Sequence, residues 1–162
     1  MATIDEWLFP LKLVSALGCG LIAGVFFAFS SFVMKALARL PPGEGVAAMQ
    51  SINRTVLNPV FLGVFVGTAA LCAVAVACSL LRWSKPGSGY LLAGGLLYLL
   101  GCFLVTMAFN VPKNEALDLI APGNPNAATL WATYLASWTA WNHVRMAASL
   151  AAAAAFSIAL RY

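Results

Sequence analysis

Long apolar stretches without a charged residue constrain this chain more than any other feature of its sequence. Three of them run from Leu13 to Met34, from Thr55 to Leu81 and from Pro86 to Pro112, and a shorter one runs from Met146 to Leu160. A helix needs about 20 mainly apolar residues to cross the hydrocarbon core of a bilayer. The first three stretches are long enough, so the sequence predicts a helical protein that crosses a membrane several times.

Composition excludes the main alternative classes. Of the 162 residues, 62% are hydrophobic and 9% are charged, whereas a soluble domain carries about 25% charged residues. The same composition excludes a disordered chain. The four cysteines lie in apolar runs without the C-x-x-C spacing of a zinc site, and they do not suggest a disulfide framework. The net charge of +4 fits Lys and Arg side chains that anchor helix ends at lipid headgroups, so no nucleic-acid partner is expected.

The apolar stretches predict a single membrane domain over residues 1–162, with an all-α fold: an integral membrane four-helix bundle. Barrel strands would be shorter and would alternate apolar with polar residues. Acidic residues precede the first apolar stretch, so we expect a retained span there and not a cleaved signal peptide. The expected spans are residues 12–34, 58–81, 89–110 and 138–160.

The predicted connections are unequal. Spans two and three are joined by a tight turn, whereas the other two connections are long. The first long connection holds a Pro- and Gly-rich turn at 41–45, after which residues 46–57 are expected to form a short extra helix. The second runs from Val111 to about Asn126. Beyond Asn126 no Pro or Gly occurs, which allows an extended last helix of about 35 residues, or about 50 Å, whose first part rises above the membrane.

Polar residues from three spans are expected to meet at one level. Spans alternate in direction, so both long connections lie on one side, and counting about 20 residues from the other side reaches Trp141, Asn110 and the turn beside Asn58. Asn and Arg near lipid are costly unless paired, and they often mark function. The candidate catalytic residues are His143, Arg145 and Arg54, and the candidate binding residues are Asn53, Asn58, Asn110, Asn114, Trp138, Trp141 and Asn142.

Helical geometry sorts the residues of the last helix. At about 100° per residue, Trp138, Asn142 and Arg145 fall on one stripe, and His143 lies well off it. His143 therefore faces a different neighbour, or the pocket wraps around the helix. Structural interpretations stay open beside the functional one: the Trp residues as an interfacial belt, the Arg residues as snorkelling side chains, the Asn residues as inter-helix contacts or caps, and His143 as a packing residue.

The sequence favours no resident cofactor. A single His excludes a bis-His haem in one chain, while a His–Met haem through Met107 or Met146 stays formally open. No carboxylate cluster supports iron, and no His/Cys set supports copper or zinc. All five acidic residues fall in expected loops or termini, which argues against a proton-coupled transporter. We therefore predict no cofactor, with haem or copper as the alternative that an absorption spectrum tests.

Five motifs follow one another along the chain: Phe29–Leu37 (FSSFVMKAL), Met49–Arg54 (MQSINR), Leu57–Phe61 (LNPVF), Phe109–Asn114 (FNVPKN) and Trp141–Arg145 (WNHVR). In this order they resemble the anthrone oxygenase-like family of integral membrane proteins, much of which is known only as a domain of unknown function. The resemblance spans nearly the whole chain. It implies oxidation of an anthrone- or hydroquinone-type aromatic substrate, with molecular oxygen as co-substrate.

A mechanism for this implied activity needs a base, a group that stabilises an anion, and a dry aromatic slot. Removal of the acidic benzylic proton of an anthrone gives an electron-rich anion that can reduce oxygen directly, so no metal is strictly required. His143 is the candidate base. Anion stabilisation and ring stacking are assigned to the polar and aromatic side chains around it, namely Arg54, Arg145, Asn110, Asn142, Trp138 and Trp141.

A competing hypothesis is a non-catalytic membrane protein that binds a quinone, a lipid or a partner subunit, and a homo-oligomer is compatible with either hypothesis. Lys and Arg are nearly balanced between the two sides of the expected bundle. If Arg54 and Arg145 serve a site, the remaining charges favour cytoplasmic termini in the cell membrane.

Overall fold

The computed structural model describes residues 4–162, and within that range the chain is helical without strands. We expect the N-terminal segment to be retained. Its residues 1–3 lie outside the described residues. In chain order the elements are α1 (Ile4–Ala28), η1 (Phe29–Val33), α2 (Met34–Leu37), α3 (Pro42–Thr55), α4 (Pro59–Leu81), α5 (Ser88–Leu96), η2 (Leu97–Leu104), η3 (Thr106–Asn110), α6 (Val111–Asp118) and α7 (Ala127–Ala159), where η marks a π-helical segment.

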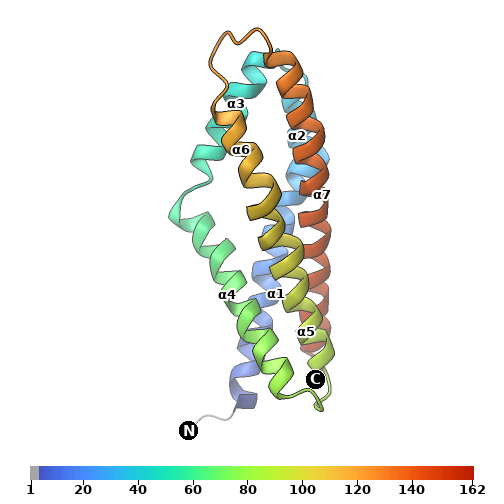
Figure 1. Cartoon of the computed structure of the whole chain (residues 1–162). Coiled ribbons are helices and arrows are strands. Elements are labelled where there is room, and N and C mark those ends of the chain that lie inside the picture. The colour runs from blue at the N-terminus through green and yellow to red at the C-terminus, as the bar shows by residue number, and fades with distance from the viewer. Residues whose placement is uncertain (1–3) are drawn as a thin grey trace.

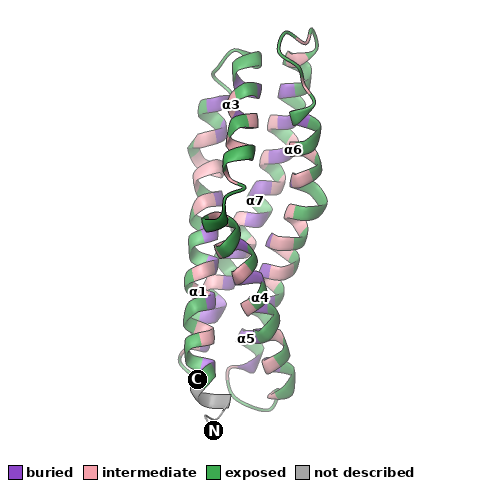
Figure 2. Cartoon of the chain, turned by 90° about the vertical axis from the view of Figure 1, so that its left-hand side faces the viewer, coloured by how far each residue is buried: buried purple, intermediate pink, exposed green. Residues whose placement is uncertain are grey.

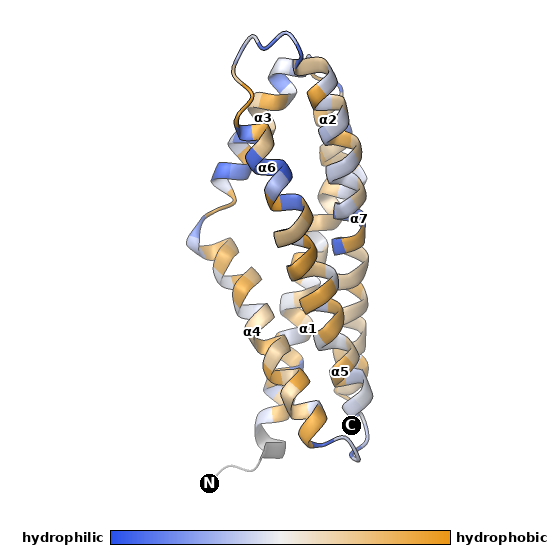
Figure 3. Cartoon of the chain, viewed as in Figure 1, coloured by the Kyte–Doolittle hydropathy of each residue, from blue (hydrophilic) through white to orange (hydrophobic). Residues whose placement is uncertain are grey.

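Three helical segments of the described chain are long and apolar enough to cross a membrane: Trp7–Leu37, Pro59–Leu81 and Ser88–Asp118. They contain the first three expected spans almost completely. The long helix α7 is not among them, because polar residues such as Asn142 and Arg145 stand in its middle. Apolar residues predominate along α4 and α5, and hydrophilic residues gather in α3 and α6 and at the turn between α4 and α5 (Figure 3).

The helices lie side by side along one long axis (Figure 1). Helix α7 packs against α1 and α5, and α4 packs against α1 and α5 on the other side. The described start of α1 and the C-terminus lie at the same end as the α4–α5 turn, whereas α3 and the α6–α7 connection lie at the opposite end (Figure 1). Buried residues face inward between the helices, and exposed residues cover their outer faces (Figure 2).

Close helix contacts depend on residues without side-chain bulk. A Cβ atom on Gly95 of α5 would lie 2.8 Å from the carbonyl oxygen of Cys72 in α4, and one on Gly101 would lie 2.5 Å from Cβ of Ala148 in α7. Both approaches are closer than a side chain tolerates, so these glycines set the spacing of the helices. One apolar cluster fills the body of the molecule, and a second, with Met49 and Trp131 among its members, lies under α3 and α6.

Two expected connections are shorter than the sequence indicated. The extra helix α3 begins at Pro42, inside the expected turn at 41–45, and ends at Thr55. The N–H groups in the first turn of a helix have no acceptor within that helix, so a proline there loses no hydrogen bond. Helix α3 can therefore begin at Pro42. The second long connection is helical as far as Asp118, because Pro112 also lies in the first turn of α6, directly after η3. Asn126 stands at the N-cap of α7, as expected, but its side chain makes no capping hydrogen bond.

Candidate functional site

The polar stripe of α7 faces the interior. Trp138, Asn142, Arg145 and Ser149 are all buried, as the helical spacing predicts, and His143 is exposed on another face. The stripe is surrounded by α1 with η1 on one side and by η3 with α6 on the other. The candidate site is therefore built from the residues that this stripe contacts.

Arg145 is a buried cation held by neutral groups. Its side chain is 4% exposed. One terminal nitrogen, Nη2, donates to Oδ1 of Asn142 at 2.7 Å, and Nη1 donates to Oγ1 of Thr106 at 3.3 Å. The guanidinium carbon lies 4.1 Å from the ring centroid of Phe26 and 5.0 Å from that of Trp138. Cation–π contacts of this kind offset part of the cost of burying the charge.

The charge of Arg145 is nevertheless not neutralised within the described chain. The ion pair between Arg54 and Asp118 does not involve Arg145, and the Nε atom of Arg145 is buried without a hydrogen-bond partner among the described residues. A buried charge without a counter-ion is expensive. An intramembrane ionisable residue of this kind is a functional candidate by default, and a cation in such a place favours negative charge on a nearby ligand.

Asn142 uses its whole amide group. Nδ2 donates to the carbonyl oxygen of Phe26 and to Oγ of Ser30, both at 2.8 Å, and Oδ1 accepts the bond from Arg145. Asn142 thus joins α7 to α1 and η1 and orients the guanidinium of Arg145. Fully satisfied buried polar networks rigidify the elements that they connect.

Ser30 links the buried network to His143. Nδ1 of His143 lies 2.9 Å from Oγ of Ser30. Oγ accepts a bond from Asn142, and its second lone pair and its own hydrogen allow it to pair with Nδ1 in either tautomer of His143. One chain of hydrogen bonds therefore runs from Arg145 through Asn142 and Ser30 to the exposed imidazole. The sequence placed His143 and Arg145 on different faces of α7, and Ser30 connects those faces.

The exposed imidazole borders a groove on the outer face of the molecule. This outer groove has a volume of about 420 Å³ and lies between η1–α2 and α7. Ligand sites typically have volumes of about 300–1,000 Å³. Its lining residues are Ser30, Met34, Lys35, Ala38, Leu135, Ala136, Thr139, Ala140 and His143. The lining is therefore mostly small and apolar, with a cation and an imidazole at its edges.

A second polar network supports the first. Asn110 is fully buried and donates through Nδ2 to the carbonyl oxygen of Trp138 at 3.2 Å. The Nε1 atom of Trp138 and the hydroxyl of Tyr134 both donate to Oδ1 of Asn114, at 2.7 and 2.9 Å. Burial raises the pKa of the Tyr134 phenol above its usual range, so this group stays a neutral donor. These bonds fix the side chains of α7 against η3 and α6.

Several residues that contact the polar stripe of α7 belong to two π-helical segments. Ser30 belongs to η1, and Thr106 and Asn110 belong to η3. A π-helical turn inserts an extra residue into the helix and occurs often at functional sites. Sequence analysis missed Ser30, Thr106, Lys35 and Phe26 as site residues. The available signal was that Ser30 and Lys35 both lie inside the motif Phe29–Leu37.

Several expected site residues lie elsewhere. The exposed Arg54 donates through Nη2 and Nε to Oδ1 of Asp118, at 2.6 and 3.1 Å. Asn58 caps α4 by accepting from the amide N–H groups of Val60 and Phe61. These two residues stabilise local structure, apart from the network of Arg145. Their expected roles at the site are not supported by this placement.

Two further expected residues lie at the edge of these networks. Asn53 of α3 lies beside Tyr134. Trp141 stacks on Phe109, with ring centroids 3.7 Å apart and planes 6° apart, so its ring face is already covered on one side. No group of three or more His, Cys, Asp or Glu side chains that could hold a metal ion occurs among residues 4–162.

A family model described as anthrone oxygenase matches residues 60–155, well over half of the chain. The chain belongs to the anthrone oxygenase family. The matched region of this family member includes Asn110, Asn142, His143 and Arg145, whereas Ser30 lies outside it. No curated protein and no solved structure matches the chain.

Proposed function

We propose that this protein is a membrane oxygenase that oxidises an anthrone- or hydroquinone-type aromatic molecule with molecular oxygen. The observation that carries the proposal is the hydrogen-bonded chain from the buried cation of Arg145 through Asn142 and Ser30 to the exposed base His143. Membership in the anthrone oxygenase family supplies the reaction class. The outer groove beside His143 supplies a place for a flat substrate.

In the proposed membrane arrangement, α7 is a fourth span that completes a four-helix bundle in the cell membrane. Helix α7 runs along α1 and α5, and its buried polar residues face those helices and not lipid. A polar residue that faces a bundle interior is compatible with a transmembrane position. The end with the α4–α5 turn has four basic residues, Lys12, Arg82, Lys85 and Arg161, and the other end has Lys35, Arg39, Arg54 and Lys113. With Lys35 assigned to the proposed site, three remain at that end against four, so we propose cytoplasmic termini by the positive-inside rule.

The proposed substrate lies in the outer groove, with one ring over Ala136 and Ala140 and its oxygen near Lys35. In the tautomer in which Nδ1–H donates to Oγ of Ser30, the free Nε2 of His143 accepts the acidic proton of the anthrone methylene carbon. General bases contribute about 10²- to 10⁴-fold. Negative charge then develops on the carbonyl oxygen of the substrate, where the ammonium group of Lys35 stabilises it.

The remaining steps balance without a further oxidant. The anthrone anion gives electrons to O₂, a carbon–oxygen bond forms at the former methylene carbon, and the resulting peroxide loses water to leave a ketone. One anthrone and one O₂ thus give one anthraquinone and one H₂O. Arg145 and Asn142 act as positioning residues, because they hold Ser30 and, through it, the imidazole ring of His143. Arg54 and Asn58 have no part in this proposal.

The test is turnover of a simple anthrone by the full-length protein purified in detergent, measured as oxygen uptake and quinone absorbance. We expect one O₂ per quinone, and we expect His143→Gln to lower kcat by about 100-fold. Ser137→Ala is the matched control, because its hydroxyl bonds to the carbonyl of Thr133 in the same helix and lines a different groove. Quinone or anthrone binding without turnover contradicts the proposal and supports a non-catalytic binding protein. Stoichiometric haem or copper in the absorption spectrum and metal analysis contradicts the cofactor-free scheme.

A further inference from the structure

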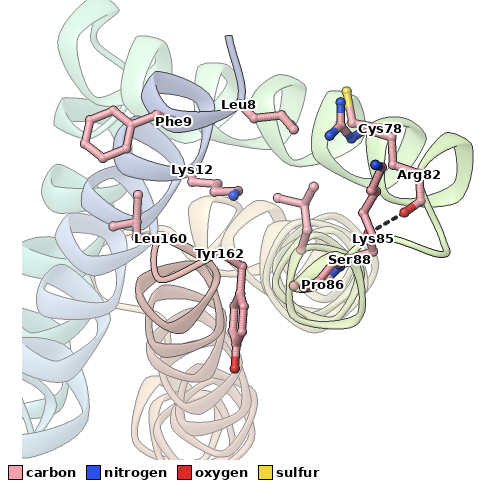
Figure 4. Close-up of a pocket in the computed structure, with 12 residues that line it drawn as sticks. Leu8, Phe9, Lys12, Cys78, Arg82, Lys85, Pro86, Ser88, Leu160 and Tyr162 are labelled. Carbon is pink, nitrogen blue, oxygen red and sulfur yellow. Dashed lines mark hydrogen bonds between the residues drawn. The ribbon is translucent and has the colours of Figure 1, made fainter. Parts of the chain in front are cut away.

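A pocket at the opposite end of the molecule is lined by basic side chains from separate elements. It has a volume of about 330 Å³ and lies between the first turns of α1, the α4–α5 turn and the C-terminus. Lys12 approaches from α1, and Arg82 and Lys85 approach from the α4–α5 turn on the other side (Figure 4). Three of the described residues that line this basic pocket are basic.

The walls of the basic pocket are fixed by the fold. Gly87 has a left-handed backbone with φ of +83°, and a Cβ atom there would lie 2.8 Å from Cβ of Tyr162, so the C-terminal residue packs directly on the turn. The hydroxyl of Ser88 donates to the carbonyl oxygen of Arg82 at 2.6 Å (Figure 4). Helix α5 begins at Ser88, which places the positive end of its dipole at the pocket.

An apolar groove continues from the basic pocket along the outside of the molecule. A second cavity of about 430 Å³ lies between α1 and α4 and shares Leu8 and Cys78 with the basic pocket. A third cavity of about 500 Å³ follows further along the same two helices and shares Val14 and Leu71 with the second. The three cavities therefore form one path, basic at the end of the helices and apolar toward their middle.

We propose that this path is a binding site for an anionic glycerophospholipid. The phosphate group lies among Lys12, Arg82 and Lys85, and one acyl chain lies in the α1–α4 groove. Basic pockets between membrane helices bind anionic lipid headgroups in this way, and both helices are apolar enough to span a membrane. A free phosphate ester can occupy only the basic pocket, because it has no acyl chain. A zwitterionic lipid can place an acyl chain in the groove, but its headgroup carries no net charge for the basic side chains. The site is separate from the outer groove beside His143 and does not depend on the proposed reaction.

The proposal is tested by native mass spectrometry of the full-length protein, titrated with dioleoyl phosphatidylglycerol, dioleoyl phosphatidylcholine or sn-glycerol 3-phosphate. We expect one phosphatidylglycerol per chain, bound at least ten times more tightly than either other ligand. Lys12→Gln combined with Lys85→Gln is expected to weaken phosphatidylglycerol binding by about 30-fold. Arg39→Gln, a cation in the connection at the other end of the molecule, is the matched control and is expected to change nothing.

A second variant tests the groove independently of charge. Val74 is half exposed and lines the apolar cavity, so Val74→Trp fills the groove without disturbing the core and is expected to weaken phosphatidylglycerol binding. Equal binding of phosphatidylcholine, equal binding of glycerol phosphate, or unchanged binding by the double Lys variant each overturns the proposal. Unchanged binding by Val74→Trp overturns the placement of the acyl chain. Circular dichroism and gel filtration establish that each variant is folded.

Discussion

Two regions of this molecule hold positive charge in different surroundings. At the level of η1 and η3, Arg145 is buried, and its guanidinium is oriented by Asn142, Thr106 and two aromatic rings. At the α4–α5 turn, Lys12, Arg82 and Lys85 line a pocket that opens to the outside. In the first arrangement the guanidinium is held in a fixed orientation by the fold, while its Nε atom has no hydrogen-bond partner among the described residues. In the second arrangement, three basic side chains from α1 and the α4–α5 turn line one pocket, which we propose as a lipid site.

Arg145→Met is expected to have the largest effect on the proposed reaction. It removes the buried cation, which favours negative charge on a nearby ligand, and it also removes the donor to Asn142 that helps to hold Ser30 and His143. Because both contributions are lost, kcat is expected to fall by about 100-fold. The variant leaves the buried Oδ1 of Asn142 without its donor, at a cost of about 1–3 kcal/mol, but it also removes an uncompensated buried charge. These two effects offset each other in part, so the thermal midpoint is expected to fall only modestly. A variant that unfolds at a much lower temperature instead would show that Arg145 serves structure.

Asn114→Leu is expected to affect stability more than any other change in the supporting network. It leaves the buried Nε1–H of Trp138 and the hydroxyl of Tyr134 without their shared acceptor. Loss of partners for two such donors costs about 2 kcal/mol. Thermal unfolding in detergent measures the loss, and Glu115→Ala at the neighbouring exposed position is the control. An unchanged midpoint would mean that these bonds exchange freely with water.

Ser30→Ala is expected to have an intermediate effect on rate. Asn142 keeps its bond to the carbonyl oxygen of Phe26, so the buried network stays intact while His143 loses its link to it. One neutral hydrogen bond contributes about 1 kcal/mol, which corresponds to about a five-fold lower kcat. If the rate of this variant equals that of the wild type, Ser30 does not position the base.

Arg54→Gln is expected to have the smallest effect. Its ion pair with Asp118 is exposed on both sides, with side chains 67% and 49% exposed, and such pairs contribute at most about 1 kcal/mol. Turnover is expected to stay within two-fold of the wild type. A large loss of activity would contradict this prediction and would support the role at the site that the sequence suggested for Arg54.

The sequence predicted the parts of this molecule that depend on hydropathy and helical period. Uncharged stretches located three membrane-length helices, and the spacing of Trp138, Asn142 and Arg145 predicted their common buried face. Counting residues along straight helices also brought Asn110 to α7. The same count placed Asn58 at that level. In the structure Asn58 lies at the break between α3 and α4, where its side chain caps α4 and does not join the network of Arg145.

The rest depends on features without a sequence signal. A π-helical turn arises from a shifted hydrogen-bond register. The residue types around Ser30 and Thr106 do not predict such a shift. The connection between His143 and Arg145 through Ser30 and Asn142 could therefore not be predicted from the sequence. The prolines at 42 and 112 were interpreted as ends of structure, although in the first turn of a helix they are tolerated. The basic pocket was missed because Lys12 and Lys85 were interpreted only as separate anchors of helix ends.

The central claim is that His143 and Arg145 belong to one site through Ser30 and Asn142. A double-mutant cycle on kcat/KM for anthrone oxidation, with His143→Gln, Arg145→Met and the combined variant, tests it most directly. Residues that act as a unit have strongly non-additive effects on rate. The account predicts that the combined variant is hardly slower than either single variant. Independent losses that multiply in the combined variant, or a single variant with the wild-type rate, would contradict it.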